Sequence, residues 1–189
     1  DGEWTNVGDA VECVIEALRG AERSSGIKIE TLYYNFDDPR MEVLRPQASR
    51  NLPGEGQIQA ADIRQVRETA ERMASHFEKK AAYATPLHFV IDDKDVVADP
   101  LGVFGRKLDV EMYLLLARSD YCAMWNKVIK RSHVARGIPV LSALSTARGI
   151  LPKADRSKKR LIADLGKDLV NLFLFEKGKI QDYSVHLCS

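Results

Sequence analysis

The sequence predicts an α/β fold, because segments with the periods of helices and of strands follow one another along its 189 residues. Segments 7–18 and 62–77 repeat apolar residues at the three- and four-residue spacing of an amphipathic helix. Segments 27–36 and 86–91 instead alternate apolar and polar residues, as half-buried strands do. With 45% hydrophobic and 29% charged residues, the chain is expected to be globular and to bury a core.

The N-terminal part of the chain is expected to begin with a helix and to continue into strands. Thr5 or Asn6 can cap the start of this helix, and Gly26 can end it in the left-handed conformation. A strand follows over 27–36. Three prolines then predict a loop-rich stretch around one short strand at 41–44.

The middle of the chain holds the helix with the most regular period, 62–77, which is followed by a pair of strands within 86–116. Between these strands, Asp99-Pro100 and two glycines predict tight turns. The remaining elements are expected in this order: a helix over 119–134 capped by Ser119 with Cys122, Trp125, Val128 and Ile129 facing inward, a strand over 138–144, a short helix from about Ser145, and a closing β-hairpin.

Charge and cysteine content exclude several classes of function. The 28 basic and 27 acidic residues are interspersed, so nucleic-acid binding is not expected, and the run 153–160 is interpreted as a solvated loop. Cysteines 13, 122 and 188 have no metal-binding spacing and favour a reducing compartment. No apolar stretch reaches the roughly 18 residues of a membrane span, and no signal peptide is recognisable.

Other residue patterns that could carry chemistry have simpler interpretations. The pair Asp92-Asp93 lacks the spacing of a calcium loop and is interpreted as a turn cap. Ser145-Thr146 has no glycine elbow around it and is interpreted as a helix cap, not as a nucleophile. The histidines at 76, 88, 133 and 186 are scattered and are expected to face solvent or to be hydrogen-bonded. We therefore predict no catalytic residue and no metal site.

Segment 86–116, PLHFVIDDKDVVADPLGVFGRKLDVEMYLLL, carries a set of features that resembles FtsA, the bacterial actin-like cell-division family. The similarity lies in the small SHS2 subdomain that distinguishes this family from other actin relatives. Segments 2–36, 57–73, 119–151 and 163–187 are similar to further elements of the family in the same order. The shared features of the first segment are Pro86, Phe89, Ile91, Asp92, Asp99, Pro100, Gly102, Gly105, Arg106 and Lys107.

The resemblance implies an architecture in two parts. Residues 1–26 and 117–189 would form part of an actin-like ATPase domain of the ribonuclease H-like class. Residues 27–116 would form an inserted strand-helix-strand-strand subdomain. The family also has a first phosphate loop, a second large domain and a C-terminal membrane helix, for which this sequence has no counterpart. The chain is therefore expected to be a fragment, with no direct membrane insertion of its own.

The resemblance also places a second phosphate loop at Asp164, Gly166 and Lys167. In actin-like ATPases an aspartate, a glycine-rich turn and a threonine bring backbone amides against the phosphates. Here Lys167, Asp168 and Leu169 replace two glycines and the threonine, and a carboxylate directed at a phosphate would repel it. ATP and Mg are therefore expected only for a fuller form of the protein, with no cofactor and no enzymatic activity for this chain.

The function implied by the resemblance is that of a cell-division scaffold that self-associates and recruits division partners at the septum. These partners would include the tubulin-like protein FtsZ, at the cytoplasmic face of the inner membrane. Loops on a strand scaffold are frequent binding sites, so Asp92, Asp99, Arg106 and Lys107 are the predicted contacts. Two alternatives remain open: an ATPase or sugar-kinase-like enzyme of the actin superfamily, and a pilus or secretion assembly protein of the same fold.

Overall fold

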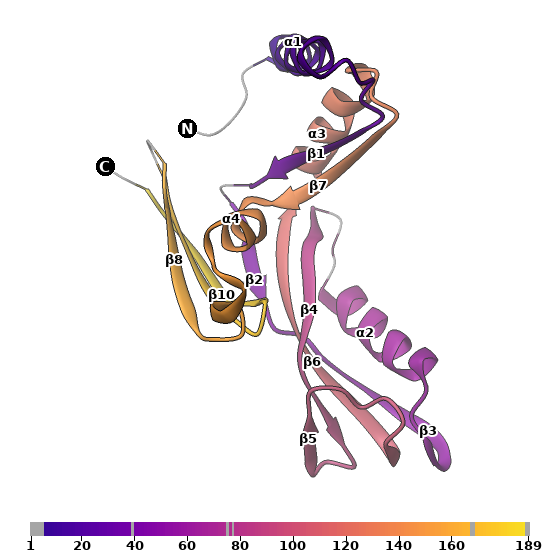
Figure 1. Cartoon of the computed structure of the whole chain (residues 1–189). Helices are drawn as coiled ribbons and strands as arrows, with labels where there is room; N and C mark the ends of the chain where they lie inside the picture. Colours follow the sequence, from indigo (N-terminus) through magenta and orange to yellow (C-terminus); the bar gives the residue numbers. More distant parts are fainter. Residues whose placement is uncertain (1–5, 39, 75, 77, 167–168, 188–189) are drawn as a thin grey trace. The chain divides into compact units, whose positions relative to one another are not determined.

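The protein divides into two compact units in a computed structural model, which describes residues 6–38, 40–74, 76, 78–166 and 169–187 (Figure 1). The first unit combines residues 1–40 with 118–189, and the second unit is formed by residues 41–117. The second unit is therefore inserted into the sequence of the first. No helix among the described residues is long and apolar enough to cross a membrane.

The first unit contains a two-stranded parallel sheet with helices. Its strands β1 and β7 are paired from Thr31 opposite Arg136 to Phe36 opposite Leu141. Helix α1 packs against α3, whose Val128 and Ile129 are buried as predicted, and Trp125 of α3 stacks on Tyr34 with ring centroids 5.1 Å apart. The elements are α1 (Val7–Ser25), β1 (Thr31–Phe36), α3 (Ser119–Arg131), β7 (Arg136–Leu141), α4 (Ser142–Ile150) and the 3₁₀ helix η1 (Lys153–Asp155).

The predicted boundaries of α1 are confirmed, whereas two predicted serine caps are wrong. The Asn6 side chain accepts a hydrogen bond from the Gly8 amide at 2.8 Å, and Gly26 ends the helix at φ 69°. Ser119 is the first residue of α3 and does not cap it, because the preceding Arg118 takes the N-cap position. Ser145 lies inside α4, where its hydroxyl donates to the carbonyl of Leu141 in the preceding turn.

The first unit also contains a three-stranded antiparallel sheet, which includes the predicted closing hairpin and the strand after it. Its order is β10-β9-β8, with β8 over Arg160–Leu165, β9 over Leu169–Glu176 and β10 over Lys179–Leu187. Phe173 and Phe175 of β9 and Ile180 of β10 are buried, and the Phe173 and Tyr183 rings stack with centroids 5.4 Å apart. These aromatic and aliphatic contacts give the sheet an apolar face of its own.

The second unit is a sheet with one helix, α2, on one face (Figure 1). Strand β6 is central, since it pairs with β2, β3 and β4, while β5 extends the sheet beyond β4. Its core is made by α2 residues Val66 and Ala70 against Leu108, Val110 and Met112 of β6. The elements are β2 (Glu42–Leu44), β3 (Gln47–Gln57), α2 (Ala60–Ala74), β4 (Lys79–Ile91), β5 (Asp95–Val97) and β6 (Phe104–Arg118).

Two features of the insertion differ from the prediction. Strand β3 occupies the stretch expected to be loop-rich. Its Pro53 falls where the ladder with β6 is interrupted, between Asn51 and Gly56, so the missing amide costs no ladder hydrogen bond. The boundary also differs from the predicted residue 27, because β1 pairs with β7 and so lies in the first unit. Alternation along a strand shows that it has a buried face, but not which sheet it joins.

We expect replacement of Leu108 by alanine to lower the free energy of unfolding of the second unit by about 2–5 kcal/mol, since this side chain is fully buried beneath α2. Urea denaturation followed by circular dichroism measures the change. Val96→Ala is the matched control, because Val96 is 68% exposed and its loss should change the free energy by less than about 0.5 kcal/mol. Equal effects of the two substitutions would show that the core does not lie where the structure places it.

Candidate protein-interaction site

The predicted contact residues belong to one end of the second unit, residues 92–107, which we call the tip. The tip contains the turn after β4, the short strand β5, and the loop that leads into β6. Strand β5 folds back on β4, with Phe89 opposite Val97. The loop is fixed to the end of β3 by two backbone hydrogen bonds of 2.9 Å, from Gly102 to Ile58 and from Ile58 to Val103. The loop of the tip is therefore held in place by backbone hydrogen bonds.

Asp92 connects the turn after β4 to the facing strand. Its Oδ1 atom accepts hydrogen bonds from the backbone amides of Arg106 and Lys107, both at 2.8 Å, and its own amide donates to the Lys107 carbonyl at 3.1 Å. The two amide hydrogen bonds, assisted by nearby basic groups, hold the pKa of the Asp92 carboxyl below its ordinary value. The carboxylate thus caps backbone amides, as the turn-cap interpretation expects, but those amides belong to β6.

The side chains of Asp99, Arg106 and Lys107 differ in how many hydrogen bonds and ion pairs they form within the second unit. The Asp99 carboxylate accepts from the Leu101 amide at 3.1 Å and so shapes the loop. Lys107 lies between Asp93, at 2.5 Å, and Asp109, at 3.3 Å, and its hydrogen bonds to these carboxylates raise its pKa. The Arg106 side chain is 73% exposed and forms an ion pair at 3.2 Å with Glu55, which is 67% exposed. Arg106 is therefore the predicted contact residue whose charge is directed most fully to solvent.

The sequence prediction missed an apolar feature of the tip. Four large hydrophobic side chains within residues 96–104 are exposed, at the end of the sheet where β5 and the start of β6 lie (Figure 1). The available signal was the run Leu101 to Phe104, which follows a turn and carries little charge. Clustered exposed apolar residues mark interaction surfaces more often than single ones. We call this set the tip patch: Val96, Leu101, Val103 and Phe104, which are 68%, 55%, 39% and 65% exposed.

The residues predicted to form a phosphate loop lie in the first unit, far along the sequence from the tip. Asp164 is half-buried near the end of β8, opposite Asn171, and Gly166 is exposed just after this strand. Lys167 and Asp168 lie outside the described residues. Leu169 begins β9. The structure thus places Asp164 near the end of a strand and Gly166 directly after it.

Two further aspartates, which the sequence analysis did not single out, make this region acidic. Asp37 accepts a hydrogen bond from the Ser142 amide, at the start of α4, at 3.3 Å. Burial and the nearby Asp164 raise the Asp37 pKa, although the hydrogen bonds from Ser142 oppose the shift. Burial, together with Asp37, Asp38 and Asp164, also raises the pKa of Tyr183 far above its ordinary value. The carboxylates of Asp37, Asp38 and Asp164 therefore all lie near Tyr183.

The described part of this region holds three carboxylates, which would repel a phosphate. Triphosphates carry several negative charges and bind where amides or cations converge. Here a carboxylate already occupies the amide at the start of α4, and the described cation beside Asp38 is Arg118, whose Nε lies 3.3 Å from it. Within the described ranges, no group of three or more histidine, cysteine, aspartate or glutamate side chains could hold a metal ion.

The histidines have local polar neighbours. His88 Nε2 lies 3.6 Å from Glu111, and the His186 ring lies 3.1 Å from the Ser184 hydroxyl. The contact of His186 agrees with the interpretation of a hydrogen-bonded histidine, whereas the distance at His88 is too long for a hydrogen bond.

Comparison with known proteins connects both units to bacterial cell division. A family model described as "SHS2 domain inserted in FTSA" matches residues 40–116. The match coincides with the second unit, residues 41–117, which the internal contacts alone had separated from the rest.

The similarity extends over nearly the whole chain. The cell division protein FtsA of Rhizobium meliloti (strain 1021) is 26% identical over 175 residues, which cover 91% of this chain and 39% of the relative. FtsA of Pseudomonas aeruginosa is 19% identical over 97% of this chain and 44% of its own length, and FtsA of Bacillus subtilis (strain 168) is 21% identical over 95% and 41%. The predicted resemblance to the FtsA family is thereby confirmed. The chain spans about two fifths of the length of these relatives.

A solved structure supports the predicted fold class. A chain of the "PilM-PilN type IV pilus biogenesis complex" aligns with 92% of this chain and 47% of its own length, with a TM-score of 0.55 and 11% identity. At this identity the likeness concerns the fold alone. It confirms the α/β class, a partial actin-like domain with an inserted small subdomain.

We expect the amide resonances of Arg106 and Lys107 to report the titration of Asp92. The Asp92 pKa is depressed in the folded state, so its hydrogen bonds are complete above the pKa of an unfolded aspartate and are lost as pH falls through the lower folded value. An NMR titration should give a midpoint below that of an ordinary aspartate. Asp92→Asn should abolish the transition at both amides, and an unchanged transition in that variant would exclude Asp92 as its source.

Proposed function

We propose that this chain is part of a bacterial cell-division scaffold that binds other division proteins through the tip of its SHS2 unit. The tip patch carries the proposal, because its four apolar side chains and Arg106 are all exposed at one end of the unit, and exposed apolar side chains are common where proteins bind one another. The similarity to FtsA over more than nine tenths of the chain supports the choice of cellular process.

The finer parts of the proposal follow from the family resemblance. Self-association and recruitment of the tubulin-like protein FtsZ at the septum are proposed as activities of the tip. The proposed location is the cytoplasmic face of the inner membrane at the division site. Asp92, Asp99 and Lys107 are assigned the role of shaping the tip, since each is bonded within it, while Arg106 and the tip patch are assigned the contacts.

A pilus or secretion assembly role is the alternative that a specific observation favours. The likeness to a chain of the PilM-PilN complex is the support for it, although the likeness concerns the fold alone. The two proposals predict different partners. Binding of purified FtsZ distinguishes them directly, because a pilus assembly protein has no need for such a contact.

We expect Phe104→Ala to weaken self-association and FtsZ binding by about tenfold or more, since exposed aromatic side chains dominate the energy of many interfaces. Sedimentation velocity measures the first and a pull-down with the immobilised chain measures the second. Met73→Ala on α2 is the matched control, because Met73 is 70% exposed in the same unit. Both variants should keep the free energy of unfolding within about 0.5 kcal/mol. If the two variants bind equally well, the tip patch is not the contact.

Arg106→Glu tests the charged part of the same surface. We expect the variant to associate more slowly and with a weaker dependence on salt, because an exposed charge at the rim of an interface acts chiefly on the rate of association. Arg64→Glu, at an exposed arginine on α2, makes the same change of charge outside residues 92–107. Stopped-flow measurements with purified FtsZ compare the two variants. Equal association rates would remove Arg106 from the proposal.

We also propose that this chain does not bind ATP or Mg-ATP and has no ATPase activity of its own. Carboxylates Asp37, Asp38 and Asp164 support this, because they surround the region where the resemblance places the phosphates. Isothermal titration calorimetry with Mg-ATP is expected to give no saturable heat up to about a millimolar. Saturable binding that Asp164→Asn alters would contradict the proposal and would restore the ATPase alternative.

A further inference from the structure

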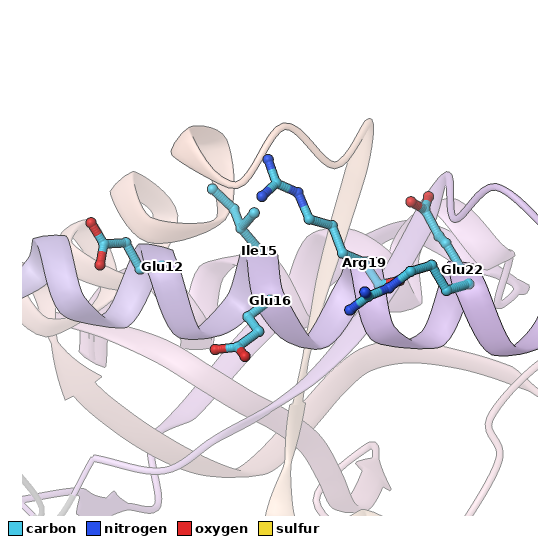
Figure 2. Close-up of a pocket in the computed structure, with 6 residues that line it drawn as sticks. Glu12, Ile15, Glu16, Arg19 and Glu22 are labelled. Carbon is cyan, nitrogen blue, oxygen red and sulfur yellow. The ribbon is translucent and has the colours of Figure 1, made fainter.

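Helix α1 presents a charged stripe to solvent that its packing on α3 does not use. Glu12, Glu16, Arg19 and Arg23 recur at spacings of four, three and four, so they lie along one face of the helix. All four residues are exposed, and they line an open cavity of about 870 Å³ along α1. Figure 2 shows Glu12, Glu16 and Arg19 in this order along the helix. We call these four residues the α1 stripe.

The order of charges in the α1 stripe is not explained by the helix itself. Glu12 and Glu16 are four apart and so are Arg19 and Arg23, which places two pairs of like charges next to one another and destabilises an isolated helix; one opposite-charge pair, Glu16 and Arg19, offsets this in part. The helix dipole favours a basic residue in the last turn, but its effect is confined to the end turns and does not reach Glu16 or Arg19. Among the described residues, none of the four side chains forms an ion pair. The stripe therefore carries four charges without an internal counterpart.

Glu22, a third carboxylate beside the same cavity, has a different role. Its Oε1 atom accepts a hydrogen bond from the Ile29 amide at 2.8 Å, which ties the helix to the segment leading into β1. Glu22 is half-buried, whereas the four residues of the stripe are exposed. Its charge therefore does not interrupt the division of the stripe into an acidic and a basic half.

The stripe is complementary to itself when two copies meet in opposite directions. Glu16 and Arg19 are equally far from the point midway between Ala17 and Leu18, and the same is true of Glu12 and Arg23. One two-fold axis through this point therefore brings both glutamates of one helix opposite both arginines of the other. A parallel arrangement would instead place like charge on like charge. We propose that two copies of this chain associate through α1 packed antiparallel, with Glu12 and Glu16 of each copy opposite Arg23 and Arg19 of the other.

The surface beside the stripe permits such an approach. Gly20 lies beside the stripe, four residues after Glu16, and the space around its Cα is open, so a second helix can come close there. Val11, the buried residue of α1, lies on another side of the helix, and α1 packs on α3. Pairing through the stripe thus leaves the packing within the first unit unchanged.

This contact differs from the proposed tip contact in place and in strength. It uses only residues of the first unit, so it stands or falls independently of the tip. One pair of helices of 19 residues buries less surface than a standard interface, which places the contact among weak, transient ones. Its specificity comes from the pairing of opposite charges, so its affinity is expected to depend strongly on salt.

A charge-reversal pair tests the proposal. The first variant, Glu12→Arg with Glu16→Arg, has an all-basic stripe, and the second, Arg19→Glu with Arg23→Glu, has an all-acidic stripe. Each is made in the Phe104→Ala background so that the tip does not contribute. Each alone should self-associate at least about tenfold more weakly than the Phe104→Ala parent, because four attractive pairs become repulsive. An equimolar mixture should associate again, since all four pairs are then attractive.

Sedimentation velocity measures association, and circular dichroism verifies that each variant is folded. The parent gives a second readout that needs no charged substitution: its association should weaken between about 0.01 and 1 M salt, over which the screening length falls from about 30 to 3 Å. Failure of the mixture to associate overturns the antiparallel pairing. Association of the parent that does not change with salt overturns it as well, whatever the variants do.

Discussion

The carboxylate of Asp38 fixes the two points at which the chain leaves and rejoins the first unit. It is fully buried, and its oxygens accept the Arg40 amide at 3.0 Å and the Arg118 amide at 2.8 Å, while the Arg118 guanidinium lies beside it. A buried carboxylate is tolerable only when it is paired and hydrogen-bonded in this way. Because residues 40 and 118 bracket the insertion, one side chain holds together the two ends that an inserted unit must bring side by side. The second unit can therefore fold around its own core without disturbing the first.

The same segment accounts for the acidic surroundings of the predicted phosphate loop. Parallel strands need a crossover connection, and here the connection from β1 to β7 contains the entire second unit and α3. Asp37 and Asp38 follow β1 directly, so the residues that secure the crossover lie at the carboxyl end of β1. Asp37 takes the amide of Ser142 at the start of α4, a position where an anionic ligand could otherwise bind. A phosphate would therefore have to compete with the Asp37 carboxylate for the Ser142 amide.

Sequence reasoning succeeded where a signal is local and failed where it is not. The limits of α1 follow from Asn6 and Gly26, and the period of α2 is visible within one stretch of sequence. The role of Asp38 could not be predicted, because its partner Arg118 lies 80 positions away and an aspartate after a strand suggests only a turn. Strand β3 was missed since prolines disfavour strands, although Pro53 falls at an interruption of the ladder. The four predicted contact residues all lie in the tip, but the exposure of its apolar side chains could not be predicted, because it depends on how the loop folds.

The polar residues of the tip explain how its apolar residues can serve as a contact surface. Exposed apolar side chains on a mobile loop would collapse onto the nearest core or would have to be ordered on binding, at a cost in conformational entropy. Here the carboxylates of Asp92 and Asp99 accept hydrogen bonds from backbone amides of the tip, and the Gly102 amide donates a hydrogen bond to Ile58 at the end of β3. Because these hydrogen bonds fix the loop in the free protein, Leu101 and Phe104 do not need to be ordered when a partner binds. In the proposed contact, Asp92, Asp99 and Lys107 therefore act by holding the loop that exposes the apolar residues, and not by touching the partner.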